Sequence, residues 1–392
     1  GGSSRRLCLL RHWRVRSGGQ NGQRPSSSLL PPWGPPGGGG EARAEIGRCR
    51  KKMTSTAGAD ASLYPRSWEN GASPYDLSVM QFNILAEGLS SPPSHVKTPP
   101  FAFKKDSTFG GFTRVPHPEA VFDYELRMWR IIEAIDDVSP CLLALQECDR
   151  FPDFFGPTLS SLGYDSHFCP KKVSPSLQFG YFSDGVGLFW KREKFDCKWF
   201  RKGQLDAGGA YVIVHLQEKA KPERDILAVT CHLKAKEESA LEDRRVTQMA
   251  EILSRVQRCL TLSRSQQVVL MGDFNAVPTD VDATKDKDGS VLKEGYHPKL
   301  VQSLLAWREP QLHSAFPITG EEVMEWFSTW KWRGDKETKR MIDYIWATGG
   351  LKLVSRLKPP PKSAMKDHGL PALGWPSDHL SFVARYSWVH EA

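Results

Sequence analysis

The sequence predicts an α/β fold in which helices cover the outer faces of mixed β-sheets. Short apolar segments with strand-like patterns recur along the chain, and two longer segments show the 3.6-residue periodicity of amphipathic helices. Helices do not separate every pair of strands, because a charged turn joins 211–217 to 226–232 as in a hairpin. A hydrophobic content of 40% and 13 tryptophans supply enough apolar surface for a buried core.

The first predicted element is a half-buried strand from Leu77, where Met80, Phe82 and Ile84 alternate with more polar neighbours. Residues 88–122 are rich in Pro, Gly and Ser and are expected to form a long loop or insertion. The later predicted elements are helices at 124–137 and about 240–260, and strands at 142–147, 186–190, 211–217, 226–232, 267–272, 342–347 and 380–386.

The positive charge of the chain is concentrated in its first 52 residues. The whole chain has 53 basic and 45 acidic residues, a formal net charge of +8. Residues 1–52 contain 11 of the basic and two of the acidic residues, so the remaining 340 carry 42 and 43, a net charge of −1. The folded part of the chain therefore lacks the overall basic charge that is typical of a nucleic-acid-binding domain.

We expect residues 1–52 to be a disordered Gly/Pro-rich tail, 53–76 a linker and 77–392 a catalytic domain. The tail is either a mitochondrial targeting segment or an extension upstream of a true start at Met53. Eight cysteines without metal-binding spacing predict an intracellular protein with reduced thiols, cytoplasmic or, if the tail is genuine, mitochondrial. No apolar run is long enough to cross a membrane.

Polar side chains occur where the predicted strands end or begin. They are Asn83, Glu147, His232, Asp273, Asn275, Asp343, Asp378 and His379. Strand ends often meet at one edge of the sheets, where α/β proteins bind ligands. Each residue alone also has a common structural explanation, as a solvated strand end, a turn residue or a cap.

This set of residue types suits metal-assisted hydrolysis of a phosphate ester. Mg²⁺ prefers a few carboxylate and carboxamide oxygens, which Glu147 and Asn83 supply, with Asp378 as a further candidate. The reaction needs an activated water in line with the leaving oxygen and positive charge on the phosphoryl oxygens. Asp273 could activate that water.

Two histidines complete this interpretation. Asp343 could hold the imidazole of His379 in one tautomer, as a carboxylate does in other catalytic pairs. His232 could donate a hydrogen bond to a phosphoryl oxygen in the transition state.

The chain resembles the endonuclease/exonuclease/phosphatase superfamily. The resemblance rests on six blocks: QFNIL (81–85), LQE (145–147), HL (232–233), GDFN (272–275), DYIW (343–346) and SDH (377–379). It implies a four-layer α/β sandwich of two packed sheets and one or two Mg²⁺ ions. It also implies Glu147 as the main metal ligand, Asn83, Asp273, Asn275 and Asp378 at the metal and phosphate site, Asp343–His379 as the polarised pair and His232 as a phosphate contact.

Within the superfamily the chain is similar to the carbon catabolite repressor type deadenylases and, among these, to the nocturnin family. The similar segments are FCPKKVSP (168–175), HLKAK (232–236) and FSTWKWR (327–333). The resemblance implies an enzyme that removes the 2′-phosphate of NADP(H) to give NAD(H). Its basic binding residues would be Lys171, Lys234, Lys236 and Arg333. Lys236 is a departure, because the family has Arg there and Lys lacks the bidentate guanidinium.

Two other functions are weighed against this one. A poly(A)-specific 3′ exoribonuclease would use the same metal chemistry but would need an extended basic and aromatic groove. A non-catalytic adaptor would require the loss of a metal or catalytic residue, and all of them are present. The sequence does not determine the oligomeric state.

Overall fold

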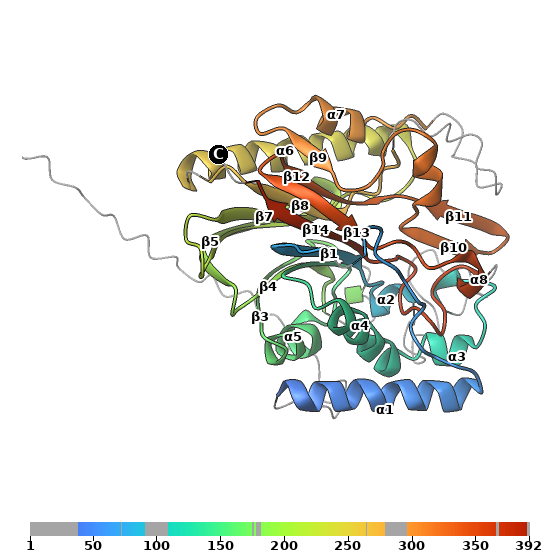
Figure 1. Cartoon of the computed structure of the whole chain (residues 1–392). Helices are drawn as coiled ribbons and strands as arrows, with labels where there is room; N and C mark the ends of the chain where they lie inside the picture. Colours follow the sequence, from blue (N-terminus) through green and yellow to red (C-terminus); the bar gives the residue numbers. More distant parts are fainter. Residues whose placement is uncertain are drawn as a thin grey trace, which may run out of the picture. The chain divides into compact units, whose positions relative to one another are not determined.

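The computed structural model describes residues 38–71, 73–90, 109–174, 176–177, 182–263, 265–278, 296–365 and 368–389. They belong to one structural unit, Gly34–Ala392, while the other unit, Gly1–Trp33, lies outside the described residues. The described residues form two six-stranded mixed sheets and a separate two-stranded hairpin (Figure 1).

The first sheet has the order β13-β14-β1-β2-β4-β3. Its strands are β1 (Leu77–Asn83), β2 (Leu142–Gln146), β3 (Tyr164–Pro170), β4 (Gly185–Lys191), β13 (Leu351–Arg356) and β14 (Phe382–Trp388). β1 runs parallel to β2 and antiparallel to β14. The carboxyl ends of β1 and β2 therefore lie together, with the amino end of β14 beside them.

The second sheet has the order β5-β6-β7-β8-β12-β9. Its strands are β5 (Phe195–Gln204), β6 (Ala210–Glu218), β7 (Asp225–His232), β8 (Val268–Asp273), β9 (Leu312–Ser314) and β12 (Asp343–Thr348). β7 runs parallel to β8, and β8 runs antiparallel to β12. This arrangement brings the ends of β7 and β8 to the beginning of β12.

The two sheets pack face to face, and helices cover their outer faces (Figure 1). Apolar side chains of both sheets, such as Val79 and Val229, share one buried cluster, and a second cluster lies between the first sheet and its helices. The helices are α1 (Gly39–Ala57), α2 (Glu87–Ser90), α3 (Pro118–Val121), α4 (Tyr124–Val138), α5 (Gly156–Ser161), α6 (Ser239–Ser263), α7 (Leu300–Ala306) and α8 (Lys362–Met365). The predicted four-layer α/β sandwich is thus confirmed.

β1 is buried along its whole length, not half-buried as its alternating pattern predicts. One face packs in the cluster between the sheets through Val79, and the other meets the helical layer through Met80 and Phe82. A central strand covered on both faces can also bury polar residues, and Gln81 and Asn83 are both wholly buried. These two side chains reach the candidate site.

The amino-terminal region differs from the predicted tail and linker. Residues 39–57 form α1, which buries Ala42, Ile46, Cys49 and Met53 against the layer that contains α4. This stripe follows helical spacing, but the surrounding glycines and arginines mask it in the composition. Arg43 Nε also lies 2.9 Å from Asp136 Oδ2, an ion pair that joins α1 to α4. Residues 1–37, the rest of the predicted tail, lie outside the described residues.

The hairpin consists of β10 (Thr329–Arg333) and β11 (Lys336–Arg340). Sequence patterning missed both strands, as well as β3, β5, β9 and β13, because polar residues interrupt their apolar alternation. Of the predicted insertion 88–122, residues 91–108 lie outside the described part. The seven cysteines of the described part are free thiols. None of the described helices is both long and apolar enough to span a membrane.

Candidate active site

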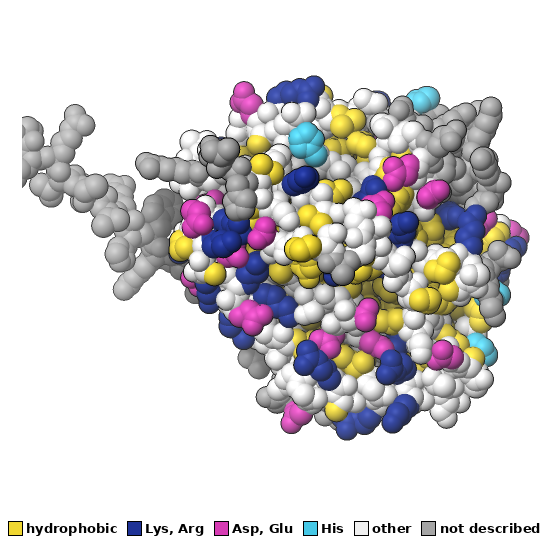
Figure 2. Space-filling model, in the orientation of Figure 1, with side chains coloured by type: hydrophobic (Ala, Val, Ile, Leu, Met, Phe, Trp, Pro, Cys, Tyr) yellow, Lys and Arg dark blue, Asp and Glu magenta, His cyan; other side chains and the backbone are white. Residues whose placement is uncertain are grey.

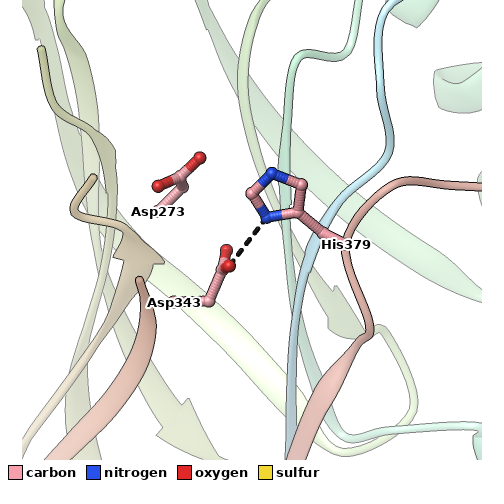
Figure 3. A group of neighbouring side chains, drawn as sticks. All are labelled: Asp273, Asp343 and His379. Carbon is pink, nitrogen blue, oxygen red and sulfur yellow. Dashed lines mark hydrogen bonds and ion pairs between the residues drawn. The ribbon is translucent and has the colours of Figure 1, made fainter. Parts of the chain in front are cut away.

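The candidate active site begins with an aspartate–histidine pair (Figure 3). Asp343 starts β12 opposite Asp273 at the end of β8, and His379 lies in the loop before β14. His379 Nδ1 is 2.7 Å from Asp343 Oδ2, and the side-chain amide of Gln81 donates to the other oxygen of Asp343. Burial lowers the pKa of His379, but the charges of Asp343 and Asp378 outweigh it and raise the value to about 9. The structure therefore places Asp343 and His379 in contact, and the raised pKa indicates a protonated imidazole.

Asn83 joins two carboxylates at the end of β1. Its Nδ2 lies 2.9 Å from Asp273 Oδ2 and 3.2 Å from Glu147 Oε1. Glu147 follows β2 and adopts a φ of 57°, a conformation that costs energy for a residue with a Cβ and is often found at functional sites. Its Oε2 accepts a hydrogen bond of 3.2 Å from the backbone amide of Ala86. The parallel pairing of β1 with β2 thus brings the two sequence-predicted residues together.

Asp273 lies at the centre of these contacts. Its side chain is buried, and burial together with the neighbouring carboxylate of Asp343 raises its pKa to about 7. The backbone amide of Asn275 donates to Asp273 Oδ1 at 2.9 Å, and His232 Nε2 is 3.5 Å from Oδ2. A carboxylate with a pKa near neutrality can exchange protons at physiological pH.

His232 ends β7 directly beside Asp273, because the two residues are partners in the parallel pairing of β7 with β8. Burial, and the positive charges of Lys171 and His379, hold the pKa of His232 well below its usual range. His232 is therefore a neutral imidazole next to a protonated one. Asn275 has a φ of 52° and donates from Nδ2 to the carbonyl of Leu233 at 3.1 Å.

Asp378 forms an ion pair with Lys331 of β10. Burial opposes ionisation of Asp378, but the charges of Lys331 and His379 hold its pKa well below the usual range. Sequence reasoning missed Lys331. Its signal was present, because Lys331 and Arg333 are two residues apart on one strand and so project from the same face.

These residues border a cleft of ≈ 600 Å³. Its walls include the predicted Glu147, His232, Asp273, Asn275 and His379, and the basic Lys236, Lys331, Arg333, Lys336 and Arg340. Lys234 is not among the described lining residues, and its backbone is bound to α6 through Gln248 and Arg245. Lys171 pairs with Asp184, and its charge acts on Glu147 and Asp273. The cleft thus joins acidic and imidazole groups to a basic wall.

The carboxylate oxygens of Glu147, after β2, and Asp273, at the end of β8, fit a hard divalent cation. Asn83, predicted as a ligand, instead turns its Nδ2 toward both carboxylates, while its oxygen accepts a hydrogen bond from the backbone amide of Leu85. A second group, Asp273, Asp343 and His379, has ligand atoms within 4.8 Å of one another. Asp343 and His379 are hydrogen-bonded to each other, so these ligand atoms already have a partner. The pair Glu147 and Asp273 is therefore the better cation site.

Comparison with known proteins agrees with this geometry. Nocturnin from Xenopus laevis is 28% identical over 332 residues, which cover 82% of this chain and 75% of the frog protein. Nocturnin from Mus musculus is 30% identical over 322 residues, or 80% of this chain and 66% of the mouse protein.

Solved structures share the fold. The human nocturnin catalytic domain with bound sulfate anion is 25% identical, with a TM-score of 0.59, and the match covers 83% of this chain and 97% of that domain. ANGEL2, a 2′,3′-cyclic phosphatase, has a TM-score of 0.61 at 21% identity, over 83% of this chain and 99% of that one. At this identity the match shows a common fold.

The sequence blocks at the candidate active site also match a family model. The model of the endonuclease/exonuclease/phosphatase family matches residues 81–379, from the strand that carries Asn83 to the loop that carries His379. Enzymes of this family are hydrolases that act on phosphate esters and generally depend on a divalent metal. This chain belongs to the endonuclease/exonuclease/phosphatase family of hydrolases.

Proposed function

We propose that the chain is a Mg²⁺-dependent phosphatase that removes the 2′-phosphate of NADP(H) and releases NAD(H) and inorganic phosphate. The observation that carries this proposal is the cleft of ≈ 600 Å³, whose lining combines Lys236, Lys331 and Arg333 with Asp273 and His379. A phosphate monoester carries close to two negative charges at neutral pH, and a compact set of cations suits it. Similarity to nocturnin over about 80% of the chain supports it.

Glu147 would hold the Mg²⁺ ion, with Asp273 beside it, and Asn83, whose Nδ2 donates to both carboxylates, would orient them. When bound, the ion supplies positive charge for the phosphoryl oxygens and lowers the pKa of a coordinated water. Asp378, which the sequence placed among the ligands, is held by Lys331. In this proposal Asp378 orients Lys331 toward the substrate phosphate.

The remaining residues would move protons and bind the transferred phosphoryl group. Asp273 accepts the proton of the attacking water, and the backbone amide of Asn275 fixes the orientation of its carboxylate. As the water oxygen bonds to phosphorus, the bond from phosphorus to the ribose O2′ breaks. His379, kept protonated by Asp343, supplies positive charge and a proton for the leaving oxygen, and neutral His232 donates to a phosphoryl oxygen.

A poly(A)-specific 3′ exoribonuclease is the competing function. One similar protein, from Schizosaccharomyces pombe, is named a probable RNA exonuclease and is 23% identical over 227 residues. The same metal and proton chemistry would cleave a phosphodiester. The two functions differ in the length of chain that the basic wall must bind, since RNA requires contacts to several successive nucleotides.

A parallel assay separates them. The full chain is incubated in Mg²⁺ with NADPH and, separately, with an oligo(A) substrate, while phosphate release and oligomer length are followed. We expect phosphate release from NADPH without shortening of oligo(A), and loss of release in EDTA. Shortening of oligo(A) with no phosphate from NADPH would overturn the proposal in favour of the exoribonuclease.

A further inference from the structure

The β10–β11 hairpin, which carries Lys331 and Arg333, is not hydrogen-bonded into either main sheet. A two-stranded hairpin is only marginally stable by itself. The cations of the basic wall therefore depend on whatever fixes the hairpin against the rest of the protein. Isolated bridges with two segments provide this support: Thr329 pairs with His379 at one end of β10, and Phe112 pairs with Arg333 at the other.

Residues 112–114, from the described end of the 88–122 insertion, lie beside β10, where Phe112 forms an isolated antiparallel bridge with Arg333. The backbone amide of Thr113 donates to the carbonyl of Trp332 at 3.0 Å. Its hydroxyl donates to the carbonyl of Gly334 at 2.6 Å. These bonds fix the register, so that the Phe112 and Arg333 side chains lie across from each other.

Two cation–aromatic contacts follow from this register. The guanidinium of Arg333 lies 4.5 Å from the centroid of the Phe112 ring, and that of Arg114 lies 3.5 Å from the Trp332 ring. Phe112 is itself held, since it is 7% exposed and its ring packs 5.4 Å from that of Phe122. A fixed ring thus supports one face of the exposed Arg333 guanidinium.

Arg333 forms no ion pair with any of the described residues, although its charge contributes to the low pKa of Asp378, which is paired with Lys331. The planar guanidinium matches a phosphate in two parallel hydrogen bonds only when its plane is correctly oriented. A long exposed side chain loses rotamer entropy when it is ordered by a ligand, and ordering it beforehand reduces that loss.

We propose that Phe112 is a positioning residue that orders Arg333 for the substrate phosphate. This inference rests on the proposed function, because it requires Arg333 to bind the phosphorylated substrate. Phe112 makes the insertion part of substrate recognition, although its own ring contacts the arginine and not the substrate.

The test compares Phe112→Leu, Phe112→Tyr, Arg333→Ala and the Phe112→Leu/Arg333→Ala double variant with NADPH as substrate. Leu keeps the apolar packing but removes the aromatic face. We expect Phe112→Leu to raise KM by roughly two- to tenfold, the range of cation–π contacts, with kcat within about twofold. In the Arg333→Ala background the same change should leave KM unaltered, because the contact is already lost. Phe112→Tyr, which retains a ring, should behave as the parent protein.

Phe195→Leu is the matched control, because it removes the ring of another cation–π contact, 5.7 Å from Lys194 Nζ, at a residue that is not among the described residues lining the cleft. It should leave KM unchanged, whatever its cost in thermal stability. The inference is overturned if Arg333→Ala raises KM and Phe112→Leu does not, or if the two effects multiply in the double variant. If Arg333→Ala leaves KM unchanged, the inference fails together with the proposed role of Arg333. Failure of the whole proposed function is distinct, since no phosphate would then be released from NADPH by the parent protein.

Discussion

Lys171 Nζ lies 2.6 Å from Oδ2 of Asp184, whose side chain is wholly buried. The other oxygen of Asp184 accepts a hydrogen bond from Ser174. Burial lowers the pKa of Lys171, but the charges of Asp184 and Glu147 outweigh it, and the pKa is raised. The lysine that the sequence assigned to substrate binding is therefore half of a largely buried ion pair, and it is not among the described residues lining the cleft.

We predict that Lys171→Met lowers the free energy of unfolding by about 3 kcal/mol, because it leaves Asp184 as an unpaired buried charge. The Lys171→Met/Asp184→Asn double variant should recover most of this loss. Urea unfolding of the three proteins measures both quantities. Equal destabilisation of the single and double variants would show that the unpaired carboxylate is not the cause.

Glu147→Ala should reduce hydrolysis of every substrate on the order of 10³-fold, because the main metal ligand supplies several kcal/mol of transition-state stabilisation. Phosphate release in saturating Mg²⁺ measures the loss. Glu125→Ala, which removes an exposed glutamate from α4, is the control and should retain activity. Full activity of Glu147→Ala would refute the metal assignment.

Asp343→Asn should lower kcat by roughly 10²- to 10⁴-fold, the contribution of a positioned acid–base group. The carboxylate of Asp343 raises the pKa of His379, so its removal lowers that pKa from about 9. The imidazolium then loses its proton at a lower pH, so the alkaline limb of the pH profile of kcat should move to lower pH. Asp225→Asn breaks another aspartate–histidine pair, 2.8 Å to His215, and should leave the profile unmoved.

Titration of the Asp149 carboxyl group should make the free energy of unfolding depend on pH. Its carboxylate accepts hydrogen bonds from Tyr124 and Ser176 at 3.3 and 3.2 Å, and burial and the charge of Glu87 raise its pKa to about 8. In the unfolded chain an Asp has a pKa of about 3.9, so between about pH 4 and 8 the folded state binds the additional proton. Linkage then requires this contribution to stability to fall as pH rises through that window, and to remain level above it.

Asp149→Asn cannot titrate and is nearly isosteric. Relative to this variant, the parent protein should lose unfolding free energy from pH 5 to 8, by at most about 1.4 kcal/mol per pH unit. Urea unfolding of both proteins at pH 5, 6.5 and 8 measures the difference. Parallel pH dependences would contradict the protonated carboxyl.

Lys236→Arg should lower the KM of the enzyme for NADP(H). Lys236 is exposed and lines the cleft, and an arginine there makes two parallel hydrogen bonds to a phosphate. We expect KM for NADPH to fall by roughly threefold to tenfold, because the guanidinium makes one hydrogen bond more than the ammonium and a typical hydrogen bond contributes about 1 kcal/mol. Lys352→Arg, an exposed substitution on β13, is the control. An unchanged or higher KM would indicate that Lys236 does not contact the phosphate.

Apolar patterning alone predicted the central strands well, because buried strands must be apolar whatever surrounds them. β4, β6, β7 and α6 lie within a few residues of their expected bounds. The hairpin β10–β11 could not be found in this way, since its strands are largely polar and are attached through bridges to the distant residues Phe112 and His379 and through the burial of Trp330. α1 was missed for a related reason, because its four apolar residues stabilise the helix only when they are buried against α4.

The sequence by itself determined the fold class, the family and the identity of the polar residues at strand ends, because these depend on local periodicity and on short blocks. It could not determine which side chains contact one another. Only the tertiary structure decided that Asn83 joins Glu147 to Asp273, that Lys331 occupies Asp378 and that Lys234 is not among the described residues lining the cleft. Those relationships depend on sheet register and on the packing of segments more than 40 residues apart, which no local pattern encodes.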